Sequence, residues 1–395
     1  MTEIPELNVG VVGHIDHGKT TLLSKLTGKF TDTHSEELKR GITIKLGYAD
    51  MTIFSDGKNF NTEKKGNPVR YVSFIDAPGH EMLMATMLSG AAIIDAAILV
   101  IAANEGIKPQ TKEHFIALQA KKIKDIIIIQ NKIDLVTKEQ ALANFKEIKN
   151  FVKDTPAENA PIIPVSAQQG ININKILEAL CDIKIPKRDT EKDPCFLIAR
   201  SFDINRPGTS IKELRGGVLG GILKHGKLKV GDEIEIKPGI IIVKANQKIY
   251  ETLNTKVLSL HKGNQEVKEV LPGVSISIET ALDPSLTKAD SLTGCISSTK
   301  GNLPEITYKL KIKSNLFNEV LGINEQKKVD PIKTKELLML SVNTTITVGT
   351  VEKISKDELE LVLNIPIVAI KQDNVGIARN INSHWRLIGF GEIIE

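Results

Sequence analysis

The chain has 395 residues, of which 41% are hydrophobic and 25% are charged. This composition is typical of a globular protein, and the length predicts two or three domains. No apolar run reaches the length of about 18 residues that a membrane-spanning helix needs, and the first residues are polar. We therefore expect a cytoplasmic protein with no membrane partner. The net charge of +4 is too small to hold a nucleic acid by bulk charge, so an RNA partner would need a local patch or a shaped pocket.

The three cysteines, Cys181, Cys195 and Cys295, lie far apart in the sequence. None belongs to a CxxC pair, so their spacing predicts neither a local metal knuckle nor a disulfide framework. We interpret all three as small buried hydrophobic residues.

The first motif is residues 13–20, which read Gly-His-Ile-Asp-His-Gly-Lys-Thr. Its loop has a glycine at each end, Gly13 and Gly18. It follows the apolar run Leu7–Val12 and precedes a helical pattern over Thr21–Leu26. Glycine permits the left-handed backbone that turns N–H groups inward, and the following helix presents its positive end. We expect the amine of Lys19 to reach the β and γ phosphates and the hydroxyl of Thr20 to bind Mg²⁺. The loop predicts that the chain binds a nucleoside triphosphate.

Up to about residue 185, short apolar runs alternate with helical stretches. Runs without polar alternation suit strands that are buried on both faces. The series predicts an α/β domain with a doubly wound, mostly parallel sheet, whose ligands lie beyond the carboxyl ends of the strands. The predicted strands are Leu7–Val12, Val69–Ile75, Ala96–Ala102, Asp125–Gln130 and Pro161–Val165.

A charged linker, Ile185–Asp193, separates this pattern from short strands interrupted by Gly and Pro, which predict two small all-β barrels. In the first barrel we expect strands Phe196–Phe202, Gly216–Gly221 and Asp232–Ile236, the last closed by Pro238 and Gly239. In the second we expect strands within Thr307–Ile312, Thr344–Val351, Leu359–Ile370 and Trp385–Ile394. The predicted domains are residues 1–190 for nucleotide binding, 191–303 for the first barrel and 304–395 for the second.

A second motif, Asp76-Ala-Pro-Gly79-His80, follows a predicted strand. An Asp-x-x-Gly sequence equally marks an ordinary turn when it stands alone. Downstream of a phosphate loop it indicates that Asp76 holds Mg²⁺ through water and that the N–H of Gly79 contacts the γ-phosphate.

A third motif, Asn-Lys-Ile-Asp at 131–134, follows the strand predicted at Asp125–Gln130. The carboxylate of Asp134 can accept hydrogen bonds from N1 and the 2-amino group of guanine, and adenine lacks both donors. A polar turn after a strand is the alternative for any single residue, but four matched residues favour guanine. The predicted base-binding residues are Asn131, Lys132, Asp134, Ser166, Ala167 and Gln168, the last three through backbone N–H groups.

Between the first two motifs lies the sequence Arg40-Gly41-Ile42-Thr43. Thr43 can complete the Mg²⁺ shell only when a γ-phosphate is present. The sequence therefore predicts a switch, in which the triphosphate orders a loop that hydrolysis releases.

The set GHIDHGKT, RGIT, DAPGH, NKID and SAQ, followed by two β-rich domains, resembles the translational GTPases. More narrowly, Ser35–Asp50 (SEELKRGITIKLGYAD) and Asp76–Glu105 resemble the gamma subunit of translation initiation factor 2 from archaea and eukaryotes. The resemblance extends along essentially the whole chain, including RLIGFGEI at Arg386–Ile393.

The resemblance implies roles for individual residues. Thr20 and Thr43 would bind the principal Mg²⁺, and Asp16 with the carbonyl of Gly41 a second one. His80 would orient the attacking water beside a hydrophobic gate of Ile15 and Ile42, with a satisfied surface imidazole as its alternative. The phosphate-binding residues would be Asp16, His17, Gly18, Lys19, Thr20 and Thr21, with Gly79 at the γ-phosphate and Asp76 and His80 serving catalysis.

The family binds GTP or GDP with Mg²⁺ and delivers methionylated initiator tRNA to the small ribosomal subunit, in a heterotrimer with alpha and beta subunits. The resemblance implies that function here, with GTP hydrolysis that is slow until assisted. Tyr48 resembles a family residue that stacks near the terminal adenosine of the tRNA, although a half-buried strand tyrosine is an equal alternative.

The sequence departs from many relatives in one segment. They carry a CxxC…CxxC zinc knuckle between the switch loop and the Asp-x-x-Gly motif, whereas Met51–Arg70 contains no cysteine here. A tetrahedral zinc site needs four Cys or His ligands, so we expect no zinc and interpret the segment as a mobile hairpin tip.

Three alternatives stay open at this point. A selenocysteine-specific elongation factor is the nearest within the superfamily. The GTPase subunit of sulfate adenylyltransferase, a metabolic enzyme, has a similar domain order. A binding scaffold that holds GTP without hydrolysing it is the third.

Overall fold

The computed structural model describes residues 4–28, 47–76, 93–244, 247–320 and 328–394. Contacts divide the chain into two compact units. The first comprises Met1–Pro186, Leu316–Asp330 and Ala378–Gly389, and the second comprises Lys187–Asn315, Pro331–Ile377 and Phe390–Glu395. Within the described ranges, none of the helices combines the length and apolar character that crossing a lipid bilayer requires. The domain boundaries expected at 190–191 and 303–304 stay predictions.

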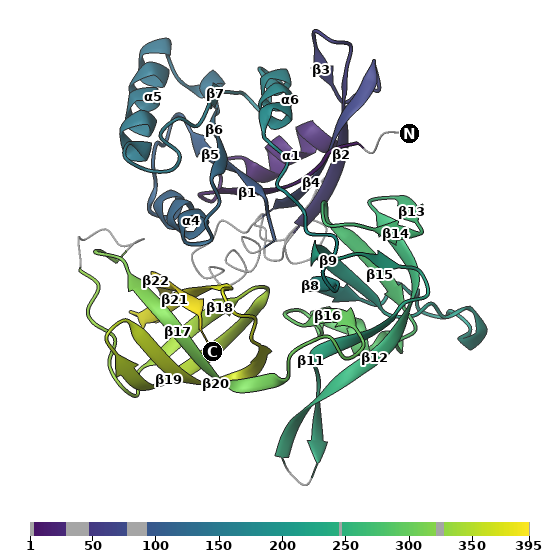
Figure 1. The fold of residues 1–395 in the computed structure, drawn as a ribbon. Helices are drawn as coiled ribbons and strands as arrows, with labels where there is room; N and C mark the ends of the chain where they lie inside the picture. The colour runs from purple at the N-terminus through teal and green to yellow at the C-terminus, as the bar shows by residue number, and fades with distance from the viewer. Residues whose placement is uncertain (1–3, 29–46, 77–92, 245–246, 321–327, 395) are drawn as a thin grey trace. The chain divides into compact units, whose positions relative to one another are not determined.

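The N-terminal part of the chain forms a seven-stranded sheet in the order β3-β2-β4-β1-β5-β6-β7 (Figure 1). Strands β4, β1, β5, β6 and β7 run parallel to one another, while β2 and β3 form an antiparallel edge beside β4. Every parallel strand lies within two residues of the predicted one. The strands are β1 Glu6–Gly13, β2 Gly47–Ser55, β3 Phe60–Asn61, β4 Asn67–Asp76, β5 Ala96–Ala102, β6 Asp125–Asn131 and β7 Ile162–Pro164.

Four described helices accompany this sheet: α1 Lys19–Thr27, α4 Pro109–Ala120, α5 Lys138–Val152 and α6 Ile173–Asp182. Leu22, Leu23 and Leu26 of α1 share one apolar core with α6 and with alternate residues of the central strands. Helix α4 packs against β1 and β5 through a separate set of buried residues. Burial of the central strands explains their continuous apolar sequence, and the predicted doubly wound α/β class is confirmed.

The segment Met51–Arg70 forms a hairpin whose tip is built from Asx turns. The Oδ1 atom of Asp56 accepts the N–H groups of Lys58 at 2.9 Å and of Asn59 at 2.7 Å. The Oδ1 atom of Asn61 likewise accepts two backbone N–H groups, each at 3.1 Å. Asp and Asn hold tight turns in this way without a metal ion. Among the described residues, no group of three or more His, Cys, Asp and Glu side chains is arranged to hold a metal, and the absence of zinc stays a prediction.

The first barrel has the strand order β11-β16-β8-β9-β15-β12-β13, and pairing of β11 with β12 closes the ring. Its apolar core includes Phe196, Ile198 and Leu219. Two further strands from the same stretch of chain, β10 and β14, form a small separate sheet. The strands are β8 Cys195–Phe202, β9 Val218–His225, β10 Leu228–Lys229, β11 Glu233–Lys244, β12 Gln247–Lys262, β13 Gln265–Val267, β14 Glu269–Val270, β15 Ile276–Thr280 and β16 Ile296–Thr299.

The expectation that Pro238 and Gly239 end a strand at Ile236 is wrong, because β11 continues to Lys244. The register with β12 shifts between Ile236 and Ile240, and Pro238 therefore sits in a bulge where its missing N–H breaks no ladder bond. Gly239 has φ 85°, and a Cβ there would lie 1.9 Å from the carbonyl oxygen of Glu251. Only glycine fits that bulge.

The second barrel is closed, in the order β17-β20-β19-β18-β21-β22. Inward-facing residues such as Leu310, Ile312 and Leu361 are buried, in alternation with neighbours that are partly buried or exposed. Two all-β barrels after an α/β domain are thus confirmed. The strands are β17 Ile306–Leu316, β18 Leu337–Val342, β19 Thr345–Ser355, β20 Glu358–Val368, β21 Asn374–Ile381 and β22 His384–Ile393.

Candidate nucleotide-binding site

The phosphate loop connects β1 to α1 through three residues with positive φ. Gly13 has φ 143°, Asp16 has φ 59° and Gly18 has φ 89°. A Cβ at Gly13 would lie 2.4 Å from the carbonyl oxygen of Val100, and one at Gly18 would lie 2.4 Å from Nδ2 of Asn131. The two glycines are therefore required by close approach as well as by backbone conformation.

Lys19 folds back over this loop. Its ammonium donates to the carbonyl oxygens of Gly13 at 3.0 Å and His14 at 2.9 Å, and the residue is only 7% exposed. The amine therefore lies against the backbone of the loop, where a phosphate oxygen could replace a carbonyl oxygen as its partner.

Thr20 and Asp76 meet although 56 residues separate them. The hydroxyl of Thr20 donates to Oδ2 of Asp76 at 3.0 Å, and Asp76 is fully buried at the end of β4. A hydroxyl and a carboxylate are oxygen ligands of the kind that Mg²⁺ prefers. The structure thus brings two of the predicted metal-binding residues together, while Asp16 is exposed in the same loop. The other predicted residues of this site, Gly41, Thr43, Gly79 and His80, and the gate residue Ile42 lie outside the described residues.

Asn131 joins the phosphate loop to the predicted base pocket. Its Nδ2 donates to the carbonyl oxygen of His17 at 2.9 Å, and its Oδ1 accepts the N–H of Ala167 at 3.0 Å. Lys132 has φ 60°, and its amine lies 3.4 Å from Oε1 of Glu105. Asp134 is exposed in the short 3₁₀ turn Ile133–Leu135, so its carboxylate is open to a ligand.

The other residues predicted at this pocket occupy the turn after β7. Ser166 and Ala167 are buried, and Gln168 is exposed. Thr21 lies in the first turn of α1 and Tyr48 lies in β2, both partly buried. The stacking and structural interpretations of Tyr48 both stay open.

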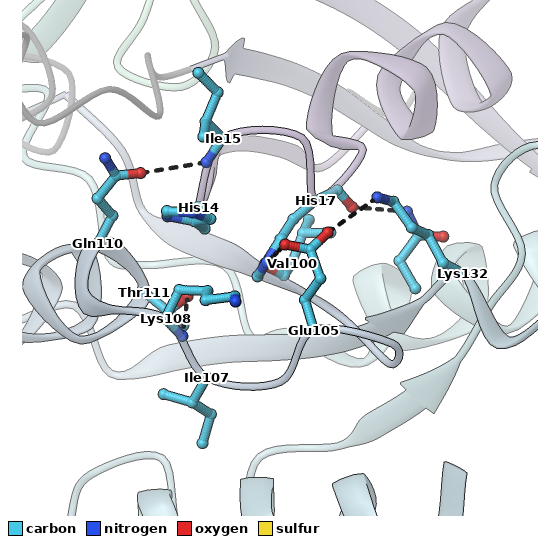
Figure 2. A network of polar contacts seen from close by, with 12 residues as sticks. His14, Ile15, His17, Val100, Glu105, Ile107, Lys108, Gln110, Thr111 and Lys132 are labelled. Carbon is cyan, nitrogen blue, oxygen red and sulfur yellow. Dashed lines mark hydrogen bonds and ion pairs between the residues drawn. The ribbon is translucent and has the colours of Figure 1, made fainter. Parts of the chain in front are cut away.

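His17 is fully buried beneath the loop (Figure 2). Burial lowers the pKa of His17 to about 3, so the imidazole is neutral at pH 7. Its Nδ1 lies 3.3 Å from the carbonyl oxygen of Val100, to which the neutral ring can donate. The 3.9 Å approach of its Nε2 to Glu105 is consequently no ion pair at that pH. This side chain supports the loop from below.

Two residues of α4 that sequence reasoning missed hold the loop from the other side. The N–H of Gly13 donates to Nδ1 of His114 at 3.0 Å. The N–H of Ile15 donates to Oε1 of Gln110 at 3.3 Å (Figure 2). More than ninety positions separate the partners in each pair. No local pattern in the sequence predicts such contacts.

Comparison with known proteins identifies the family. Residues 5–186 match the family described as Elongation factor Tu GTP binding domain, and residues 308–393 match Initiation factor eIF2 gamma, C terminal. The chain is 50% identical over 403 residues to translation initiation factor 2 subunit gamma of Methanococcus vannielii, and the match covers 98% of each chain. The chain belongs to the gamma-subunit family of translation initiation factor 2. As a member of that family it is a translational GTPase.

Solved structures of two elongation factors share the fold of this gamma-subunit family member. A bacterial selenocysteine-specific elongation factor has a TM-score of 0.78 at 24% identity, and the match covers 99% of this chain but 58% of that one. The factor SelB of Methanococcus maripaludis, solved with the GTP analogue GppNHp, has a TM-score of 0.74 at 25% identity over 100% of this chain and 80% of that one. The much higher identity to the initiation factor favours the gamma-subunit family over the other GTPases considered.

Proposed function

We propose that this gamma-subunit family member delivers methionylated initiator tRNA to the small ribosomal subunit and releases it when GTP is hydrolysed. The alpha and beta subunits of the same factor would be its partners. The observation that carries the proposal is the convergence of Lys19, Thr20, Asp76 and Asn131 on one loop. Family membership supplies the translational context.

The residues present fit a guanine nucleotide with Mg²⁺. The loop and Lys19 would hold the phosphates, while Thr20, Thr43, Asp16 and the carbonyl of Gly41 would hold magnesium, with Asp76 reaching it through water. A bound Mg²⁺ neutralises charge on the phosphates. Asp134 would select guanine, beside Asn131, Lys132, Ser166, Ala167 and Gln168.

Hydrolysis would depend on His80, whose imidazole would orient water past the gate of Ile15 and Ile42. Phosphoryl transfer needs mainly positioning and charge neutralisation, so a displaced histidine keeps hydrolysis slow without weakening nucleotide binding. Thr43 would couple the γ-phosphate to the tRNA-binding surface. We therefore expect Thr43→Ala to abolish the difference in tRNA affinity between the GTP and GDP forms.

The decisive experiment is a filter-binding comparison of methionylated initiator tRNA and charged elongator tRNAs, each with GTP and with GDP. We expect selective retention of the initiator with GTP. Equal retention of all charged tRNAs would contradict delivery of the initiator. Hydrolysis stimulated by ATP, sulfate and a partner enzyme would instead favour the sulfate adenylyltransferase alternative.

A further inference from the structure

Helix α4 holds the opening half of the phosphate loop through two side chains. Nδ1 of His114 accepts the N–H of Gly13 at 3.0 Å, and Oε1 of Gln110 accepts the N–H of Ile15 at 3.3 Å. His114 is 1% exposed, so water is not available to replace its bond to Gly13. The two N–H groups are thereby committed to the helix, and the position of α4 sets the position of the loop.

His114 makes this bond as a neutral ring. Burial lowers its pKa to about 3, and the positive charge of Lys19 acts in the same direction. Because Gly13 is the donor, Nδ1 must be the acceptor and the ring proton must lie on Nε2. A neutral acceptor fixes the loop without adding charge beside the predicted phosphates.

The same helix is fixed at a second point by a buried ion pair. Glu113, next to His114 in the chain, accepts a hydrogen bond from Nη1 of Arg386 at 2.8 Å. Glu113 is fully buried and Arg386 is 7% exposed. Arg386 belongs to β22, 273 positions away, within the same compact unit as α4. Removing one partner of a buried ion pair is costly, so loss of Arg386 would destabilise Glu113 in its present position.

We propose that α4 links Arg386 to the phosphate loop, so that the Glu113–Arg386 contact controls how fast guanine nucleotide leaves. Gln110 and His114 are positioning residues in this scheme, since they act on the nucleotide through the loop backbone. Glu113, Gln110 and His114 lie within two turns of one rigid helix, and a small shift at Glu113 is carried to both hydrogen bonds. The inference rests on the nucleotide binding proposed above.

The first test removes the two acceptors. Release of a fluorescent GDP analogue from the full chain is followed by stopped flow for His114→Leu and Gln110→Met. We expect each to accelerate release about tenfold, which corresponds to about 1.4 kcal/mol, the order of one buried hydrogen bond. His114→Asn places an acceptor oxygen near the position of Nδ1, so it should restore most of the wild-type rate. Equal rates for His114→Leu, His114→Asn and wild type would overturn the positioning role.

The second test asks whether Arg386 acts through those bonds. Arg386→Met should accelerate release about tenfold in the wild-type background. In a His114→Leu, Gln110→Met background it should add less than about twofold, because the two hydrogen bonds that connect α4 to the loop are already removed. A full tenfold effect in that background, or no effect in the wild-type background, would overturn the link. If Arg386→Met does not fold, Arg386→Lys and Glu113→Gln test the same contact with smaller changes in volume.

Two matched controls separate the link from general loosening. Lys112→Gln changes an exposed charge on the same helix and should leave release unchanged. Lys224→Met breaks another ion pair, between Lys224 and Asp373 in the second compact unit, and should lower the melting temperature without changing release. Faster release from Lys224→Met would assign the Arg386 effect to lost stability. Failure of the wild-type chain to bind GDP would instead contradict the proposed function, and the two failures are therefore distinguishable.

Discussion

The side-chain nitrogen of Asn131 lies 2.9 Å from the carbonyl oxygen of His17, which ties the end of β6 to the phosphate loop. The oxygen of the same amide accepts the N–H of Ala167 at 3.0 Å. One buried side chain therefore satisfies backbone groups from two loops that are 150 positions apart, counting from His17 to Ala167. The part of the site predicted to hold phosphates and the part predicted to hold the base share this residue.

Asn131→Ala should weaken both the phosphate-binding part and the base-binding part of the site. The carbonyl of His17 and the N–H of Ala167 would lose a partner, and an unpaired buried group costs about 1–3 kcal/mol. We expect the free energy of unfolding to fall by that order in urea titrations and GDP affinity to fall at least tenfold. Asn59→Ala, an exposed position at the hairpin tip, is the matched control. Unaltered GDP affinity in Asn131→Ala would show that the bridge does not shape the site.

Asp134→Asn should change which base is bound. The carboxylate is predicted to accept two donors of guanine, and an amide would present one acceptor and one donor, which suits xanthine better. Competition assays should show loss of GTP binding together with a gain for xanthosine triphosphate. Asp125→Asn, an exposed carboxylate at the start of β6, should leave selectivity as it is. Retained preference for GTP in Asp134→Asn would reject the assignment.

The strands that position the site could be predicted because they are buried on both faces. Ala96–Ala102 is apolar throughout and all seven residues are buried, so its sequence has no other good interpretation than a central strand. At the antiparallel edge of β2 and β3 the sequence predicts only the hairpin tip within Met51–Arg70, because the alternating burial of β2 gives a weaker pattern than a continuous apolar run. The sequence wrongly predicts a strand end at Pro238, because the bulge that accommodates this proline depends on the neighbouring strand.

The motifs likewise reveal part of the site and leave the rest hidden. Lys19 and Asn131 could be predicted because each belongs to a short motif that follows a strand and has fixed residue types at fixed spacing. The contacts by which His17, Gln110 and His114 hold the phosphate loop could not be predicted, because each contact joins positions far apart in the chain. A buried histidine has the same sequence signature whether it holds a loop or fills a core.

His80→Ala should lower the rate of GTP hydrolysis without weakening GTP binding. His80 lies outside the described residues, and the expectation rests on its place after Asp76 and on family membership. Loss of one preorganised group that orients water should lower hydrolysis on the ribosome by about 10²–10³-fold, with GTP affinity intact. Single-turnover hydrolysis and equilibrium binding measure the two effects. Hydrolysis at the wild-type rate would refute the role.

Acidification should destabilise the protein well above the range in which ordinary carboxylates titrate. Burial lowers the pKa of both His17 and His114 to about 3, against an ordinary value of 6.5. Between these values the unfolded chain binds protons that the folded chain excludes, so the stabilisation is complete above pH 6.5 and is lost as pH falls toward 3. Each histidine contributes a slope of at most about 1.4 kcal/mol per pH unit.

Urea unfolding between pH 7.5 and pH 5 measures this slope before most carboxylates protonate. Replacing the buried histidine in His17→Gln should reduce the slope below pH 6.5 by at most about 1.4 kcal/mol per pH unit, whatever it does to stability at neutral pH. Above pH 7 the two proteins should show parallel curves, because neither state of either histidine is then charged. Identical slopes at pH 5–6 in the variant and the wild type would mean that His17 takes up its proton as readily when folded as when unfolded.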